Sequence, residues 1–181
     1  MKKLLFISTA AIAAMLTGCA SPATVQGMVS NTPPTTLIRS HLLKNNISVT
    51  TTQGGRSTNP IGKSQVNNQS FKAALIASLQ KANLYATLSS SHYNLTAHLL
   101  ELKKPFVGIS MTDECKVHYK IIDKKTHKII FNKIISNQYT AKFSSAIFGI
   151  KRLRLANEGV IRNNIKILIE KLYKLNIPTS P

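Results

Sequence analysis

The sequence has no tryptophan, two cysteines, and six acidic side chains against 24 Lys and Arg in 181 residues. Two cysteines allow at most one disulfide, so the fold must rest on its hydrophobic core. Six carboxylates, none of them in an obvious apolar pocket, leave little material for general acid–base catalysis. No apolar run of membrane-spanning length follows the first twenty residues. We therefore expect neither an enzyme nor a second membrane segment.

The motifs of common catalytic and metal sites are also missing. Gly62-Lys63-Ser64 looks like the end of a phosphate-binding loop, but the first glycine of that loop is replaced by Ser57. Cys115 and His118 are three residues apart, and on a strand they point to opposite faces. We expect Cys115 to line the core. The five histidines lack paired-ligand spacing. The sequence thus predicts no metal, no cofactor and no catalytic residue.

The first residues form a distinct segment. Lys2 and Lys3 precede an apolar stretch over 4–15, which is the layout of a secretory signal peptide and is too short for a comfortable transmembrane helix. The stretch ends in Leu16-Thr17-Gly18-Cys19, a branched apolar residue, two small residues and a cysteine. An ordinary signal peptide with an accidental cysteine is the alternative interpretation.

Leu16-Thr17-Gly18-Cys19 resembles the lipobox of bacterial lipoproteins. The resemblance implies that Cys19 is the lipidation site, with a diacylglycerol on its thiol and a third acyl chain, such as palmitate, on its amino group. Each buried methylene contributes about 0.8 kcal/mol, and two chains already give stable anchoring. The first partner would therefore be a lipid bilayer. Ala20 follows the cysteine, which in this family favours the outer membrane, on its periplasmic side.

Removal of the signal peptide, residues 1–18, leaves 163 residues and lowers the formal net charge from +18 to +16, because Lys2 and Lys3 are lost. This charge predicts an anionic neighbour such as lipid phosphate, lipopolysaccharide or cell-wall polymer. A compositional bias toward Lys, Asn and Ile explains it equally well. Nucleic acid is disfavoured, because aromatic residues are not interleaved with the basic ones.

The composition divides the remainder into three parts. Residues 19–45 are rich in Pro, Ser and Thr, and we expect a lipidated flexible tether with a root-mean-square reach of about 28 Å. Residues 46–177 form a single periplasmic domain, and residues 178–181 a short tail.

Hydrophobic periodicity predicts an α+β domain in the order β-α-β-β-β-α. Two amphipathic helices would cover one face of a four-stranded, mostly antiparallel sheet. The expected strands are 46–53, 93–102, 114–123 and 128–140, and the expected helices are 68–83 and 152–175. Asn68 or Ser70 is expected to cap the first helix. The last strand has apolar residues on both faces, so we expect a central position for it.

Charged residues follow the outer face of the last helix at four-residue steps, which predicts a solvated ladder of ion pairs. Its members are Arg154, Glu158, Arg162, Lys166, Glu170 and Lys174. Near the start of this helix, Lys151, Arg152 and Arg154 are a candidate anion-binding site together with free backbone amides. Alternatively, Arg154 pairs with Glu158 and the other two are solvated. Asp113 and Glu114 are expected to face solvent.

Two apolar segments, 143–150 and 105–109, either cover the core or form exposed surfaces for a partner or a membrane. With the lipobox and the element order, the chain resembles small outer-membrane lipoproteins of Gram-negative bacteria, including the lipopolysaccharide-assembly lipoprotein and auxiliary lipoproteins of lipid-transporting ABC systems. The resemblance implies a non-catalytic accessory or structural component of a cell-envelope assembly or transport complex. The alternative is a binding module for anionic glycolipid, phospholipid or cell-wall polymer.

Overall fold

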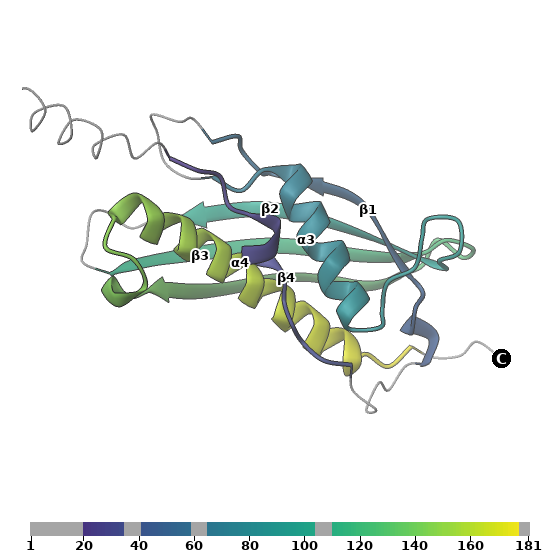
Figure 1. Cartoon of the computed structure of the whole chain (residues 1–181). Coiled ribbons are helices and arrows are strands. Elements are labelled where there is room, and N and C mark those ends of the chain that lie inside the picture. The colour runs from purple at the N-terminus through teal and green to yellow at the C-terminus, as the bar shows by residue number, and fades with distance from the viewer. Residues whose placement is uncertain (1–19, 35–40, 59–64, 104–109, 178–181) are drawn as a thin grey trace, which may run out of the picture.

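A computed structural model describes residues 20–34, 41–58, 65–103 and 110–177 (Figure 1). The predicted signal peptide, Cys19 and the tail therefore lie outside the described residues, as does the apolar segment 105–109.

Four strands form one open sheet in the order in which they occur along the chain. They are β1 (Ile47–Gln53), β2 (Tyr93–Lys103), β3 (Met111–Asp123) and β4 (Ile129–Ala141). Strands β1 and β2 are parallel, whereas β2–β3 and β3–β4 are antiparallel. The four strands predicted from alternation are thus confirmed, with β3 beginning three residues earlier than expected.

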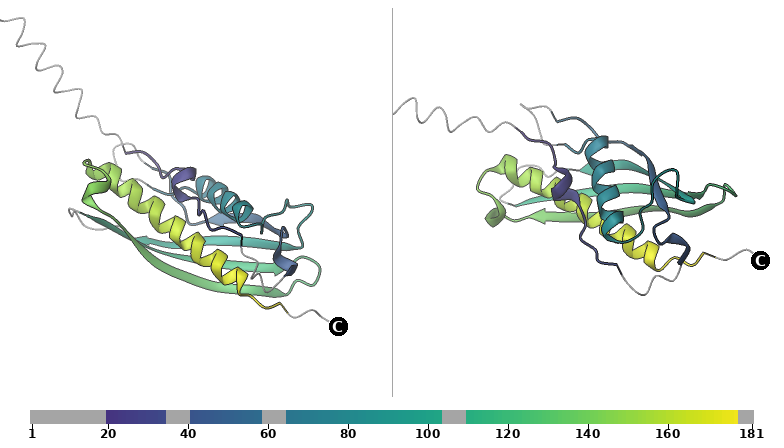
Figure 2. Two further views of the ribbon diagram at one scale, coloured as in Figure 1. Left: turned by 60° about the horizontal axis from the view of Figure 1, so that its bottom comes forward. Right: turned by 45° about the vertical axis from the view of Figure 1, so that its right-hand side comes forward.

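Both long helices, α3 (Asn68–Lys81) and α4 (Gly149–Tyr173), cover the same face of the sheet (Figure 2). A parallel pair of strands needs a crossover connection, and α3 lies within the one that joins β1 to β2. The predicted α+β fold is confirmed. The core lies between the helices and the sheet, and its fully buried side chains include Phe71, Leu75, Leu79, Leu95, Val117, Tyr119, Ile121, Ile161, Ile165 and Leu168.

The cap of α3 corrects one prediction. Asn67 has extended backbone angles, and its side chain accepts the Ser70 amide hydrogen at 2.7 Å. Asn68 lies inside the helix, where its side chain accepts the Gly55 amide hydrogen at 2.8 Å. The cap is therefore Asn67 and not Asn68 or Ser70.

Strand β4 is an edge strand, which corrects the prediction of a central one. Phe131 and Ile135 are buried beneath α4, but Ile129 and Ile134 are 54% and 60% exposed. The second apolar face of this strand therefore lies in solvent, and apolar composition alone could not separate the two environments.

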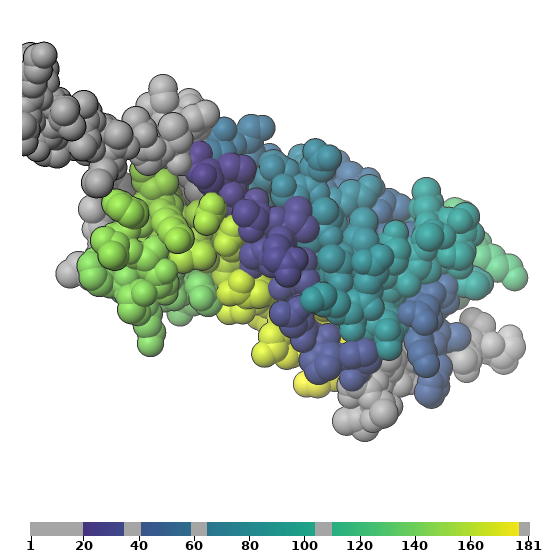
Figure 3. Space-filling model, viewed as in Figure 1, coloured from purple at the N-terminus to yellow at the C-terminus, as the bar shows by residue number. Residues whose placement is uncertain are grey.

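Residues 20–34, here called the N-terminal segment, lie across α3 and α4 (Figure 3, purple). A short helix, α2 (Val25–Met28), places Met28 at 0% exposure, and Val29 beside it is also buried. The prediction of a flexible tether is therefore wrong for this part of residues 19–45. Ala23, Met28 and Val29 of this segment belong to the hydrophobic core, which its Pro and Ser content did not indicate.

Candidate functional site

The predicted lipidation site is followed directly by the folded body. Ala20, the next residue in the sequence, is already buried at 6% exposed. Three residues after Ala20 the segment is held by a hydrogen bond: the Ala23 amide donates to the Gln65 carbonyl oxygen at 3.0 Å, and Ala23 is 2% exposed. The junction between the candidate anchor and the domain is therefore short.

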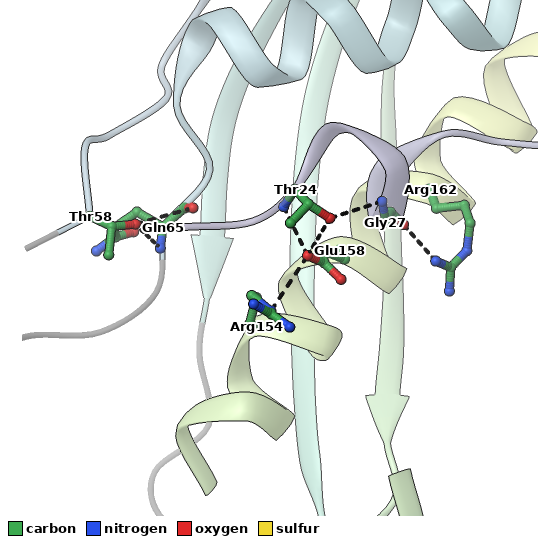
Figure 4. A network of polar contacts seen from close by, with 7 residues as sticks. All are labelled: Thr24, Gly27, Thr58, Gln65, Arg154, Glu158 and Arg162. Carbon is green, nitrogen blue, oxygen red and sulfur yellow. Dashed lines mark hydrogen bonds and ion pairs between the residues drawn. The ribbon is translucent and has the colours of Figure 1, made fainter. Parts of the chain in front are cut away.

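Thr24 is the centre of the contact between the N-terminal segment and α4 (Figure 4). Its amide and its hydroxyl both donate to Oε1 of Glu158 at 2.8 Å. The same hydroxyl accepts the Gly27 amide hydrogen at 3.0 Å and so caps α2. One carboxylate of the last helix thus holds a turn that lies 134 residues earlier in the chain.

Two arginines of α4 complete this contact (Figure 4). The Arg154 Nε atom is 3.7 Å from Glu158 Oε1, and Arg162 Nη1 donates to the Gly27 carbonyl oxygen. The guanidinium of Arg162 also lies 5.7 Å from the centre of the Tyr139 ring. Arg162 thus contacts both the N-terminal segment and strand β4, and Arg154 contacts the carboxylate that binds Thr24.

The solvated ladder predicted on α4 is therefore wrong in its first half. Glu158 is only 5% exposed, because the N-terminal segment covers it. Further along the helix, Lys166 and Glu170 form an exposed pair at 3.8 Å, as the four-residue spacing predicted.

The rest of the N-terminal segment is bonded along both helices. The Ser30 amide donates to the Ser78 hydroxyl at 2.9 Å, and Lys81 donates to the Asn31 side chain at 2.7 Å. The Tyr173 hydroxyl lies 3.0 Å from the Pro33 carbonyl oxygen, to which it donates. The segment is thus attached from Ala23 to Pro33.

Two glycines allow this close packing. A Cβ atom on Gly27 would lie 2.3 Å from Cδ of Glu158, and one on Gly159 would lie 2.2 Å from the Tyr139 ring. Neither position has room for a side chain unless its neighbour moves. Sequence reasoning missed Thr24 and Gly27 and placed Arg162 on a solvated face, because the partners of these residues are remote in the chain. The only local signals were a threonine followed three residues later by glycine, and the apolar pair Met28-Val29.

At the candidate anion site near the start of α4, two of the three basic side chains are already bonded to other groups of the chain. Arg152 is 7% exposed, and its Nη1 donates to the carbonyl oxygens of Ala146 and Ile147 at 2.7 Å each. Arg154 pairs with Glu158, as the alternative interpretation predicted. Lys151 is exposed. The prediction that Arg152 is solvated is wrong, because its guanidinium supports the preceding loop.

Cys115 lines the core, as expected from its position on the strand. It is 1% exposed, and its Sγ lies 3.1 Å from Oδ1 of Asn137. Burial raises the pKa of this thiol to about 12, so it carries almost no thiolate at neutral pH. His118 bonds to Asn132 instead, so the two do not form a reactive pair.

Asp113 is fully buried, which corrects the prediction that it faces solvent. The alternation of β3 places it on the same face as Cys115 and Val117, whereas Glu114 points outward as expected. Within the described ranges, no three His, Cys, Asp or Glu side chains come together as a metal site. Among the same residues, no helix combines the length and apolar character that crossing a membrane requires.

No protein-family model matches the sequence, and no curated protein matches it. A crystal structure of a Xanthomonas campestris protein of the family model DUF330 has a TM-score of 0.58 at 9% identity, over 80% of this chain and 91% of that chain. A candidate lipoprotein from Caulobacter crescentus has a TM-score of 0.50 at 15% identity, over 74% and 90%. A hypothetical protein from Chlamydia trachomatis has a TM-score of 0.50 at 9% identity, over 71% and 98%. The chain therefore shares its fold with these bacterial proteins.

Proposed function

We propose that this chain is a lipid-anchored, non-catalytic protein of the bacterial cell envelope. In this proposal, acylated Cys19 holds it on the periplasmic side of the outer membrane, where it is an accessory or structural part of an assembly or transport complex. The observation that carries the proposal is the lipobox-like Leu16-Thr17-Gly18-Cys19, which ends one residue before the folded body begins.

The fold supports the same proposal. One of the proteins that share it is described as a candidate lipoprotein. The arrangement of polar groups supports a non-catalytic role, since Glu158 binds Thr24 and Asp123 accepts amide hydrogens of its own turn. The alternative, a binding module for anionic lipid or polymer, stands second because Arg152 and Arg154 already have partners within the chain.

Substitution of the two cysteines tests the anchor. We expect Cys19→Ser to abolish incorporation of radiolabelled palmitate. We also expect the variant to leave the membrane fraction in which the unaltered protein is found. Cys115→Ala is the matched control, because it removes the other, buried thiol and leaves labelling intact. Equal labelling of Cys19→Ser and the unaltered protein would overturn the proposal.

The accessory role needs its own measurement. A pull-down in mild detergent should recover envelope proteins in fixed stoichiometry with the lipidated chain. Recovery of the chain alone, together with salt-sensitive retention on lipopolysaccharide that Lys151→Glu abolishes, would favour the binding module instead.

A further inference from the structure

The loop that leads into α4 exposes large apolar side chains, here called the apolar corner. Its four members are exposed to 52% (Phe143), 80% (Ile147), 71% (Phe148) and 45% (Ile150). They belong to a short 3₁₀ helix, η3 (Phe143–Ser145), to the following connection and to the first turn of α4. A cluster of this kind on a protein surface marks an interaction site.

The loop is held in this exposed form from inside. Arg152 is almost fully buried, donates to the carbonyl oxygens of Ala146 and Ile147, and places its guanidinium 4.9 Å from the centre of the Phe143 ring. A buried arginine thus satisfies the polar backbone on the inner side, while the apolar side chains of Ile147 and Phe148 face outward. Arg152 therefore holds the loop of the apolar corner in a conformation that keeps its apolar side chains exposed.

The apolar corner lies at the end of the molecule where the candidate anchor attaches. Both the start of the N-terminal segment and the start of α4 lie at this end, whereas the end of α4 lies toward the opposite one (Figures 1 and 2). The sheet register places the apolar corner at the end of the sheet where β3 begins and β4 ends, because Met111 pairs with Ala141. Only residues 20–22 separate Cys19 in the sequence from Ala23, the first hydrogen-bonded residue of the N-terminal segment, so an anchor on Cys19 would hold this end of the domain close to a bilayer.

The charge around the apolar corner fits a lipid surface. Lys142 and Lys151 are exposed on either side of it, and residues 124–157 contain no Asp or Glu. Basic side chains beside an apolar surface match the anionic headgroups and acyl boundary of a bilayer. A protein groove with an acidic rim would accept the same side chains, and the experiment below distinguishes it from a bilayer.

We propose that the apolar corner inserts into the interfacial layer of the same bilayer that holds Cys19, giving the domain a second membrane contact and a fixed orientation. This inference rests on the proposed lipid anchor and adds a site to it. Ile147 and Phe148 enter the acyl boundary, and Lys142 and Lys151 meet lipid phosphates.

The absence of tryptophan provides a direct test. Phe148→Trp places a single tryptophan in the apolar corner of the lipidated full chain. Leu88→Trp is the matched control: Leu88 is 61% exposed and lies just before β2, where Tyr93 pairs with Asp123 at the opposite end of the sheet. Both proteins are reconstituted in phosphatidylethanolamine–phosphatidylglycerol vesicles, with or without lipid brominated in its acyl chains.

We expect the emission of the Phe148→Trp protein to move to shorter wavelength on reconstitution, and its quenching by brominated lipid to exceed that of Leu88→Trp severalfold. Lys142→Glu/Lys151→Glu in the Phe148→Trp background should reduce this quenching. Equal quenching of the two tryptophan variants in vesicle-bound protein would overturn the inference.

Flotation of the same vesicles separates the two proposals. Protein that floats with vesicles but shows equal quenching of both tryptophan variants supports the lipid anchor and contradicts the second membrane contact. Protein that does not float contradicts the lipid anchor itself. A Phe148→Trp protein that is quenched in no vesicle, but whose tryptophan becomes shielded in a complex recovered by pull-down, would assign the apolar corner to a protein partner and overturn the bilayer contact.

Discussion

At the scale of single residues, Glu158 accepts two hydrogen bonds from Thr24 of the N-terminal segment. Glu158→Gln keeps the shape of the side chain and removes its charge. Because hydrogen bonds to charged groups contribute about 1.5–3 kcal/mol, we expect a loss of about 1–3 kcal/mol in the free energy of unfolding. Denaturant unfolding measures this loss, and limited proteolysis should cut residues 20–34 first.

Glu170→Gln is the matched control, since Glu170 is an exposed member of an ion pair on the same helix. Such surface pairs contribute about 0–1 kcal/mol. Equal effects of the two substitutions would show that the contact of Thr24 with Glu158 does not hold the segment.

Gly27→Ala should lower the free energy of unfolding much as Glu158→Gln does, because the added Cβ displaces the same carboxylate.

The buried thiol of Cys115 makes the free energy of unfolding depend on pH in the alkaline range. Its pKa is raised by burial from 9.0 to about 12, so the unfolded chain releases a proton that the folded chain keeps. The stabilisation is complete below the unfolded pKa and is lost as pH rises toward the folded one. We expect the free energy of unfolding to fall between about pH 9 and pH 12, and to fall less steeply in Cys115→Ala.

Chemical unfolding at a series of pH values measures this slope. Burial raises the pKa of Tyr119 in the same direction, so some slope remains in the variant. A folded protein whose Cys115 reacts with iodoacetamide at neutral pH as fast as the unfolded chain would contradict the burial on which the prediction rests.

Single residues were predictable from the sequence where a local pattern decides them. The alternation of β3 placed Cys115 in the core, and the four-residue spacing on α4 predicted the pairing of Arg154 with Glu158. The burial of Asp113 and Arg152 was missed. Charged side chains are normally exposed. The burial of Asp113 follows from strand alternation only when β3 begins at Met111 and not at Glu114, and that of Arg152 depends on the loop before α4.

At the scale of elements, the start of α3 shows where pattern reasoning stops. Three polar residues, Asn67, Asn68 and Ser70, stand near the helix start, and each is of a type that caps helices. Periodicity located the helix to within a few residues. The choice among the three depends on which residue has extended backbone angles, and this is set by the loop before it.

Asn67→Ala should therefore lower the free energy of unfolding by about 1 kcal/mol, the usual value of a lost cap. Ser70→Ala is the control: its amide hydrogen, which the cap accepts, is retained, so we expect a smaller effect. Thermal denaturation of both variants measures the difference. A larger effect at Ser70 would contradict the assignment of the cap.

At the scale of the whole molecule, the feature that the sequence did not predict is that the domain already includes residues 20–34. The sequence predicted the α+β sheet with its helices, because alternation and helical periodicity are local signals. It could not predict that residues 20–34 are folded, because their composition is that of a linker and their binding surface exists only in the tertiary structure. The same applies to the edge position of β4.

A linker inserted between Cys19 and Ala20 tests this arrangement. Twenty Gly/Ser residues have a root-mean-square reach of about 25 Å, enough to uncouple the domain from the bilayer surface. We expect the protein to float with vesicles as before, while quenching of Phe148→Trp by brominated lipid falls. The same insertion between Lys125 and Thr126, in the exposed turn after β3, should leave the quenching unchanged.

The contact of Thr24 with Glu158 also has a consequence for the order in which the chain is built. Synthesis proceeds from the N-terminus, and the surface that receives Thr24 and Gly27 is contributed by the last helix. The first part of the domain to emerge must therefore wait until nearly all of the chain has been made. During that interval the apolar side chains of Val25, Met28 and Val29 lack the part of their binding surface that α4 supplies, and an interrupted chain would leave them partly exposed to proteases and holding chaperones.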